Sequence, residues 1–182
     1  MIKVAIFGGS FDPPHSGHYA ISQSVLEKLE IDKLIIVPTF LNPFKQSSLA
    51  TAQMRLDWCR RVFNNKSIEV DSYEIDLGRA VFSSQTIKHF KQLYDVKYLI
   101  IGADNLKSIT KWHNFEWLNR EIIWAVALRD GFEVNLSMLR EYVIIDISID
   151  ISSSEIRECN NLKYIDNKIV TEVKNIIEKG KE

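Results

Sequence analysis

The 182-residue sequence is poor in cysteine, glycine and proline, and it carries almost no net charge. Its two cysteines, Cys59 and Cys159, are too few and too far apart for a disulfide framework or a CxxC metal or redox motif, and they fit a reducing environment. The longest apolar runs, at residues 34–38, 98–101 and 122–128, are far shorter than the roughly 20 residues that cross a bilayer. We therefore expect a cytoplasmic protein without a membrane segment or signal peptide.

Charge is nearly balanced, with 23 basic and 24 acidic side chains, a net charge of -1 and an isoelectric point near 6.4. This balance argues against a nucleic-acid partner, which would need a broad positive surface. Small phosphorylated ligands need only a local cluster of positive charge and backbone donors, so the composition is compatible with them. A chain of this length can bury a substantial core, and we expect residues 1–182 to form a single domain.

Apolar, β-rich runs alternate with helical patterns along the chain. Most runs are continuous, which is typical of parallel strands covered on both faces. We expect strands at residues 2–7, 33–38, 68–70, 96–101, 122–128 and 142–147. Apolar residues at helical spacing lie between them: Ile21, Val25 and Leu29; Met54, Trp58 and Val62; Ile87, Phe90 and Tyr94. This order predicts an α/β fold, a doubly wound, mostly parallel sheet with helices on both faces and ligands at the carboxyl ends of the strands.

Two segments stand outside this alternation. Residues 39–50 contain Pro43, several serines and threonines and the single Lys45, and we expect them to form a flap. Residues 152–180 are expected to be a C-terminal helical segment, in which Asp166 caps the last helix. The expected apolar face of that helix is Ile169, Val173 and Ile176 or Ile177.

The most informative segment runs from Gly8 to His18, directly after the first expected strand and before the first expected helix. Gly8 and Gly9 let backbone amides approach a phosphate, and a helix that begins near Gly17 directs its N–H groups to the same place. The spacing is neither G-x-G-x-x-G nor G-x-x-x-x-G-K-[ST]. It therefore speaks against a dehydrogenase fingerprint and against a P-loop.

His15 and His18 are two imidazoles three residues apart at a helix start, and both can donate hydrogen bonds to a triphosphate. A histidine pair is also a common surface or capping feature, and its spacing suits zinc less well than HExxH does. The glycines around the pair, in the first strand-to-helix turn, favour the phosphate-binding interpretation.

The segment Phe11-Asp12-Pro13-Pro14-His15-Ser16-Gly17-His18 resembles the HxGH signature of the nucleotidyltransferase superfamily, in the form found in adenylyltransferases that build dinucleotide coenzymes. A second segment, Ile151-Ser152-Ser153-Ser154-Glu155-Ile156-Arg157, resembles the superfamily's C-terminal ISSTxIR element, with Ser154 in place of the usual threonine. Ser152 and Glu155 also form a capping-box pattern, so the serines could instead only start a helix. Arg157 stands where a cation could meet the same phosphates as the histidines.

A third segment carries a more specific resemblance. Gly102-Ala103-Asp104-Asn105 and Lys111-Trp112-His113 resemble the GADN and KWH elements of bacterial nicotinate-nucleotide adenylyltransferases. The resemblance implies that Trp112 stacks on the pyridine ring of the mononucleotide and that Asp104 contacts a ribose or phosphate-bearing part of the ligands. A positively charged pyridinium over an indole face is a reasonable physical pairing. Alternatively Trp112 is a core tryptophan, as we expect for Trp58, Trp117 and Trp124.

Lesser elements match the family, and two depart from it. Residues 42–45 lie where the family has a flap ending in His-Lys, with Phe44 in place of the histidine; Arg55 has a family counterpart, and Arg129 follows the fifth strand. Val81-Phe82-Ser83 stands where many members have Ser-Tyr-Thr near the pyridine carboxylate. Because Phe82 lacks a phenol, recognition of the carboxylate must rely on backbone N–H groups and Ser83. Independently of the site, residues 82–94 have the pattern of an amphipathic helix with a serine cap.

The resemblance extends from Ile2 to the last helix and implies a Rossmann-like nucleotidyltransferase fold. It implies transfer of the adenylyl group of ATP to nicotinate mononucleotide, giving deamido-NAD and pyrophosphate in NAD biosynthesis. Nicotinamide mononucleotide and phosphopantetheine are alternative acceptors, and a noncatalytic nucleotide sensor on the same fold is an alternative of another class. Mg²⁺ is expected on the ATP phosphates rather than on metal-binding residues of the protein. The sequence leaves both a monomer and a homodimer open.

The resemblance assigns residues to three roles. The catalytic residues are expected to be His15, His18 and Arg157, with the histidines acting as hydrogen-bond donors rather than proton shuttles. The residues expected to bind ATP are Gly8, Gly9, Ser10, Phe11, His15, His18, Gly102, Asp104, Ile151, Ser153, Ser154 and Arg157. The residues expected to bind the mononucleotide are Ser10, Phe11, Lys45, Phe82, Ser83, Asp104, Trp112 and Arg129.

Overall fold

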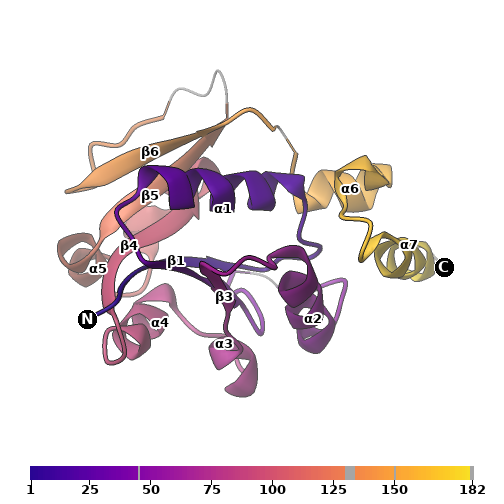
Figure 1. Ribbon diagram of the computed structural model, residues 1–182, viewed down its shortest axis with the longest axis horizontal. Coiled ribbons are helices and arrows are strands. Elements are labelled where there is room, and N and C mark those ends of the chain that lie inside the picture. The colour runs from indigo at the N-terminus through magenta and orange to yellow at the C-terminus, as the bar shows by residue number, and fades with distance from the viewer. Residues whose placement is uncertain (45, 130–133, 150, 181–182) are drawn as a thin grey trace.

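A parallel sheet of six strands lies at the centre of the structure, a computed structural model that describes residues 1–44, 46–129, 134–149 and 151–180 (Figure 1). The strands are β1 (Lys3–Gly9), β2 (Lys33–Pro38), β3 (Ile68–Val70), β4 (Asp95–Gly102), β5 (Ile123–Arg129) and β6 (Tyr142–Ile147). They are paired in the order β3-β2-β1-β4-β5-β6, so the strand order reverses between β1 and β4. The predicted doubly wound sheet is confirmed. Three strands have the predicted bounds, and the other three differ by one or two residues at their ends.

Helices cover both faces of this sheet. The α-helices are α1 (Ser16–Lys28), α2 (Ala52–Val62), α3 (Tyr73–Asp76), α4 (Ser83–Phe90), α5 (Phe115–Glu121), α6 (Ser153–Cys159) and α7 (Val170–Lys179). Short 3-10 helices are η1 (Ala103–Lys107), η2 (Ile109–Lys111) and η3 (Leu162–Tyr164). Neighbouring strand residues point to opposite faces. In β2, Leu34 and Ile36 pack in a cluster with α1, α2, α6 and α7, whereas Ile35 and Val37 pack in a second cluster with α4 and α5. The continuous apolar runs therefore serve two cores.

Two helix starts differ from the sequence prediction. Phe82, not a serine, is the N-cap of α4, and its backbone N–H donates to Gln85 Oε1 at 3.2 Å. The predicted serine cap is therefore wrong, because the side chain of Gln85 supplies the capping contact. Asp166 does not cap α7: its carboxylate accepts from Lys168 N at 2.8 Å, within the turn before the helix, and Ile169 is the N-cap.

The expectation of core tryptophans is right for two of the three. Trp58 and Trp124 are buried, and their ring N–H groups donate to Glu172 and Asn119, respectively, at 2.9 Å. Trp117 is only half-buried. Its ring is covered by two ammonium groups, Lys88 Nζ at 4.9 Å and Lys91 Nζ at 6.0 Å from the ring centroid. Long lysine side chains can bury their stems on an apolar ring while the charge stays in water.

The two segments outside the alternation differ in structure. Residues 39–44 and 46–50 form neither helix nor strand, and movement of this flap stays a prediction. The C-terminal segment contains α6, η3 and α7, and it packs on the first core cluster through Ile156, Val173 and Ile177.

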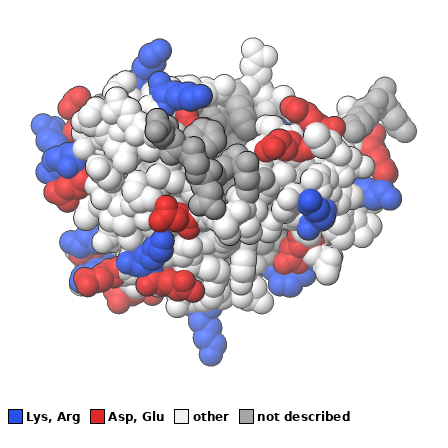
Figure 2. Space-filling view, turned by 90° about the horizontal axis from the view of Figure 1, so that it is seen from above, with Lys and Arg blue, Asp and Glu red and all other residues white. Residues whose placement is uncertain are grey.

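Neither a face of one charge, in the view of Figure 2, nor a membrane-spanning helix is seen in the described part of the chain. Figure 2 shows acidic and basic side chains interspersed over one face of the molecule. None of the helices in the described part of the chain has the length and apolarity that a membrane span requires.

Candidate active site

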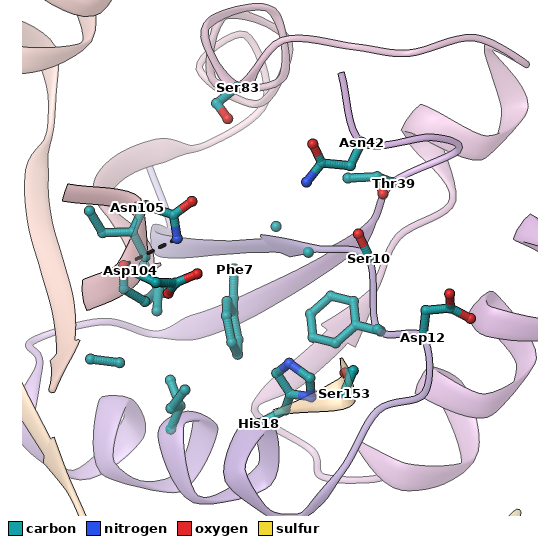
Figure 3. Close-up of a pocket in the computed structure, with 18 of the residues that line it drawn as sticks. Phe7, Ser10, Asp12, His18, Thr39, Asn42, Ser83, Asp104, Asn105 and Ser153 are labelled. Atoms are coloured by element: carbon teal, nitrogen blue, oxygen red, sulfur yellow. Dashed lines mark hydrogen bonds between the residues drawn. The ribbon is translucent and has the colours of Figure 1, made fainter. Parts of the chain in front are cut away.

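A cavity of about 530 Å³ opens at the carboxyl ends of β1 and β4, where the strand order reverses. This is where open α/β sheets bind their ligands, and the volume suits a small ligand. Its walls come from segments far apart in the sequence: the β1–α1 turn, the flap, the start of α4, the end of β4 and the segment from Ile151 to Arg157 (Figure 3).

The turn after β1 lies later than predicted. β1 continues through Gly8 and Gly9, which were expected to form the turn, and the chain turns at Phe11, whose φ is 46°. A positive φ is unfavourable for a bulky residue, so the surrounding packing must hold it. The Phe11 ring is buried and makes edge contacts with Phe7 at 5.4 Å and Phe63 at 5.7 Å between centroids.

The histidine pair caps α1. His15 Nδ1 accepts from Gly17 N at 3.1 Å, and His18 Nδ1 accepts from His15 N at 3.2 Å. The two rings are 3.8 Å apart between centroids. Because each Nδ1 is an acceptor, the neutral rings carry their proton on Nε2. Capping therefore uses one nitrogen of each ring and makes the other a hydrogen-bond donor, so the two interpretations of the pair are compatible.

Gly17 suits the same arrangement. A Cβ at this position would lie 3.0 Å from both Cε1 and Nδ1 of His15, closer than side-chain carbons normally approach. A glycine between the histidines therefore lets the His15 ring fold back over the first turn of α1.

The serines of the second motif partly have a structural role. Ser152 and Glu155 form a capping box, in which Glu155 N donates to Ser152 Oγ at 3.2 Å and Ser152 N donates to Glu155 Oε2 at 2.8 Å. The capping alternative is thus realised for Ser152, which was not among the predicted binding residues.

The other residues of this motif attach α6 to the β1–α1 turn. Ser153 Oγ donates to Pro13 O at 2.9 Å, and Arg157 Nη1 donates to Asp12 O at 2.6 Å. Arg157 Nη2 also donates to Ser154 Oγ at 3.1 Å. These contacts bring two motifs about 140 residues apart in the chain to the same end of the cavity.

Arg55 is a buried cation that joins the β1–α1 turn to both ends of the flap. Its guanidinium donates to four backbone carbonyls, those of Ser10 at 2.6 Å, Thr39 at 2.8 Å, Phe40 at 2.8 Å and Ala50 at 3.3 Å. The side chain is fully buried. The planar, forked guanidinium is suited to contacts in several directions.

Asp12 completes this connection. Its carboxylate accepts from Leu49 N at 2.7 Å and Ala50 N at 2.9 Å, and the residue is 4% exposed. Burial lowers the pKa of Arg55, and the nearby Asp12 carboxylate opposes that shift. Both residues had partial signals in the sequence, because Asp12 lies within the first motif and Arg55 has a family counterpart. Neither was predicted as a site residue.

Aromatic rings line the opposite part of the cavity. Phe82 stacks on His113 at 4.6 Å between centroids, and Ser84 Oγ lies 2.9 Å from His113 Nδ1. Trp112 is half-buried: it lines the cavity and also contacts Trp124 edge to face at 6.2 Å. Trp112 is therefore a cavity residue, and it also packs against the second core cluster.

The end of β4 presents polar groups to the cavity. A Cβ at Gly102 would lie 2.5 Å from Asp104 Oδ1, so any other residue here would displace this carboxylate from its observed position. Asn105 Nδ2 donates to Gly102 O at 3.1 Å (Figure 3). Asp104 is exposed at the cavity wall.

Glu74, on α3, is a buried acid that lines the cavity and that sequence reasoning missed. It is 4% exposed, and its Oε1 accepts from Thr86 Oγ1 at 2.6 Å. Its Oε2 is buried and has no hydrogen-bond partner within the described residues. Burial raises the pKa of Glu74 to about 7, although the Thr86 hydroxyl works in the opposite direction. Residues 71–80 are mostly polar and contain no motif that would single this acid out.

The cavity brings together nearly all predicted site residues. Those that line it are Gly8, Gly9, Ser10, Phe11, His15, His18, Phe82, Ser83, Gly102, Asp104, Trp112, Ile151, Ser153, Ser154 and Arg157. Lys45 lies outside the described residues, and Arg129 is the last residue of β5, with a side chain that also lies outside the described part. Lining residues that were not predicted include Asp12, Thr39, Asn42, Glu74, Asn105 and His113. Among the described residues, no group of three or more His, Cys, Asp or Glu side chains is arranged to hold a metal ion.

Comparison with known proteins identifies first the class and then the family. A family model described as Cytidylyltransferase-like matches residues 6–159, and with the doubly wound fold it defines a cytidylyltransferase-like protein. A probable nicotinate-nucleotide adenylyltransferase of Sulfurovum sp. (strain NBC37-1) is 50% identical over 181 residues, 99% of this chain and 96% of that protein. One of Aliarcobacter butzleri (strain RM4018) is 39% identical over 184 residues, 100% of both chains. The chain belongs to the nicotinate-nucleotide adenylyltransferase family.

Solved structures share the fold. The Plasmodium falciparum nicotinic acid mononucleotide adenylyltransferase complexed with NaAD matches with a TM-score of 0.72 at 22% identity, over 99% of this chain and 96% of that chain. The same protein complexed with APC matches with a TM-score of 0.70 at 20% identity, over 100% of this chain and 96% of that chain.

Proposed function

We propose that this protein transfers the adenylyl group of ATP to nicotinate mononucleotide, giving deamido-NAD and pyrophosphate in NAD biosynthesis. The observation that carries the proposal is the cavity between β1 and β4, which joins hydrogen-bond donors and aromatic rings. Full-length similarity to proteins named probable nicotinate-nucleotide adenylyltransferase supports the choice of substrate.

The two kinds of lining residue occupy different parts of the cavity. Figure 3 shows His18 and Ser153 on one side of Ser10, and Ser83 on the opposite side. This separation supports an ATP triphosphate at the start of α1 and a pyridine ring at the start of α4. The phosphate of the mononucleotide would then meet the α-phosphorus of ATP near the Ser10 backbone.

The reaction needs positioning more than proton transfer. The nucleophile is the phosphate of the mononucleotide, which is ionised at neutral pH, so a strong general base and a covalent intermediate are unnecessary. The protein has to hold this phosphate in line with the α-phosphorus and to stabilise charge that moves onto the leaving pyrophosphate.

The phosphate side of the cavity supplies donors for that charge. We assign this role to the Nε2–H groups of His15 and His18, whose tautomers are set by their capping contacts, and to Arg157. The Ser153 hydroxyl donates its one proton to Pro13 O, so it would join them by rotating toward a bound phosphate. The first turn of α1 adds backbone N–H groups and the positive end of the helix dipole. Because hydrogen bonds already orient these groups, little reorganisation accompanies the reaction.

Magnesium fits this site as a companion of ATP. The donors on this side of the cavity are the Arg157 guanidinium and the Ser153 hydroxyl of α6 and the backbone N–H groups at the start of α1, which suit phosphate oxygens rather than a metal ion. Mg²⁺ is commonly held by substrate phosphates and water, where it neutralises charge on the phosphoryl oxygens. His18, Arg157 and Ser153 would bind the oxygens that the ion leaves available.

The pyridine side offers donors for a carboxylate. In the first turn of α4, Gln85 N and Thr86 N donate to Phe82 O, and Phe82 N donates to Gln85 Oε1. The N–H groups of Ser83 and Ser84 precede these intrahelical donors and suit an anionic ligand. Recognition of the acid would then rest on the backbone, as Phe82 in place of tyrosine requires.

The first experiment measures pyrophosphate release by the purified protein with ATP and Mg²⁺. Nicotinate mononucleotide, nicotinamide mononucleotide and phosphopantetheine are supplied separately. A clear preference in kcat/KM for the nicotinate compound is expected. Release with none of the three, despite ATP binding, would place the protein in the sensor class.

A substitution tests the assignment of His18. We expect His18→Ala to lower kcat by about 100-fold to 1,000-fold, the usual cost of removing one oriented donor to a developing charge. Loss of its capping contact should cost only about 1 kcal/mol of stability. His89→Gln is the matched control, because this histidine stacks on Tyr73 and does not line the cavity. Near-normal kcat in folded His18→Ala would contradict the assignment.

The remaining assignments are also proposals. A single domain over residues 1–182 is supported by the packing of α6 and α7 on the same core cluster as α1 and α2. The cytoplasmic location and the choice between monomer and homodimer stay predictions.

A further inference from the structure

The pyridine side of the cavity contains an acid for which the proposed reaction gives no reason. Glu74 lines the cavity, yet the residue is 96% buried, since only 4% of its surface is exposed. Thr86 satisfies one carboxyl oxygen, and the other has no partner within the described residues. An unpaired, buried carboxylate oxygen is costly, whereas a neutral carboxyl group at the same place costs much less.

Glu74 is held at the first turn of α4. Its partner Thr86 is the fourth residue of this helix, and Thr86 N donates to Phe82 O, the carbonyl of the N-cap residue. The same turn contains the N–H groups of Ser83 and Ser84, which we assign to the pyridine carboxylate. The acid of the protein and the acid of the substrate would therefore share one helix start.

The elements around Glu74 carry several other ionisable groups. On α3 they are Tyr73 and Asp76, and in the cavity wall His113. On α4, Lys88 lies over the Trp117 ring and His89 stacks on Tyr73 at 3.8 Å, and on β2, against which α3 packs, Lys33 pairs with Glu69 of β3. Asp76 is exposed and accepts from Ser72 Oγ at 2.7 Å. Burial raises the pKa of Glu74, the Thr86 hydroxyl partly opposes that shift, and no charged side chain contributes.

We infer that Glu74 is a specificity-determining residue: its neutral carboxyl group allows the start of α4 to accept the carboxylate of nicotinate mononucleotide. The inference rests on the proposed function. Two carboxylates at one buried helix start repel each other, so the anionic substrate binds with Glu74 protonated. The amide substrate carries no such charge and tolerates Glu74 in either state. Above neutral pH, binding of the acid is coupled to uptake of a proton from solvent.

The test is the ratio of kcat/KM for nicotinate mononucleotide to that for nicotinamide mononucleotide between pH 6.5 and 8.5. Both mononucleotides carry the same phosphate and react with ATP bound at the same site. Ionisations that affect both reactions equally therefore cancel in the ratio. For a group that titrates at about 7, the ratio should fall by up to about 20-fold across this range. In Glu74→Gln, an uncharged side chain of nearly the same shape, the ratio should be independent of pH.

Three variants separate Glu74 from its neighbours. Thr86→Val removes the hydroxyl that favours the carboxylate, so the midpoint of the fall should move to higher pH. Asp76→Asn removes an exposed carboxylate from the same helix and should leave the curve unchanged. His113→Gln should also leave the slope in place. If His113→Gln, rather than Glu74→Gln, abolishes the slope, the inference is overturned.

Calorimetry gives a readout that does not depend on turnover. Binding of nicotinate mononucleotide at pH 8 is measured in two buffers of different ionisation enthalpy, with nicotinamide mononucleotide and Glu74→Gln as references. We expect uptake approaching one proton only for the acid and only in the wild-type chain. A ratio that is flat with pH, or acid binding without extra proton uptake, overturns the inference even where pyrophosphate release supports the proposed function. If release fails with both substrates, the proposed function is wrong, and proton uptake still decides the role of Glu74.

Discussion

Removal of the Arg55 guanidinium should destabilise the protein strongly, because this side chain organises three segments of backbone. In Arg55→Met, the carbonyls of Ser10, Thr39, Phe40 and Ala50 each lose a charged donor. Hydrogen bonds to charged groups contribute about 1.5–3 kcal/mol each, but they are not additive, and freed carbonyls at the cavity can bind water. Removal of one partner from a buried charged network typically costs about 3–5 kcal/mol.

We therefore expect Arg55→Met to lower the free energy of unfolding by about 4 kcal/mol, and Tm by roughly 10 °C for a chain of this size. Urea unfolding followed by circular dichroism measures the former, and a thermal scan measures the latter. Arg61→Met, on the same helix, is the matched control: Arg61 is partly exposed and donates to Glu172 and to Lys168 O. It should cost less than about 1 kcal/mol.

Arg55→Lys should behave differently from Arg55→Met. An ammonium group keeps the charge, but its three donors cannot reproduce the planar fork that reaches carbonyls on both sides of the flap. Intermediate stability and a raised KM for both substrates are expected, since the Ser10 loop and the flap ends would shift together. If Arg55→Met is as stable as Arg61→Met, the four contacts do not hold the flap, and the account given for Arg55 is refuted.

Three further outcomes follow from the same structure. Glu74 has a folded-state pKa of about 7, above its ordinary 4.5, so the folded state retains a proton that the unfolded chain releases; stability should fall by about 3 kcal/mol between pH 4.5 and 7, and Glu74→Gln, compared by urea unfolding at several pH values, should lack this part of the fall. Glu172 has the opposite shift, because Arg61 and the Trp58 ring N–H lower its pKa to about 2. Its contribution to stability, at most about 1 kcal/mol at this exposed site, is present above pH 4.5 and disappears as pH falls through 2. The stability of Glu172→Gln should therefore decline less steeply than that of the wild type in acid unfolding. Trp112→Leu should raise KM for the mononucleotide about tenfold with little change in KM for ATP, since loss of a stacked cation–π contact costs about 1–2 kcal/mol; equal changes in both KM values would contradict its assignment to the pyridine side.

Local patterns determined much of the fold. The strands at 33–38, 68–70 and 142–147 were predicted with their observed bounds, because short β-rich segments flanked by polar residues leave few alternatives in a parallel sheet. Helix ends were predicted less well, as α4 shows. Its cap depends on how the side chain of Gln85 folds back, and several serines nearby could have taken that role.

The sequence alone determined the α/β class, the order of the strands along the chain and the motifs around His15, Trp112 and Arg157. These are properties of short segments, whose spacing carries their meaning. Tertiary structure decided which atoms face one another: that Ser153 meets Pro13, that Arg55 joins the flap to the Ser10 turn, and that Glu74 shares a helix start with Ser83. Burial and hydrogen-bond partners are relations between distant residues, so a lone glutamate or arginine in a polar stretch gives no local sign that folding will enclose it.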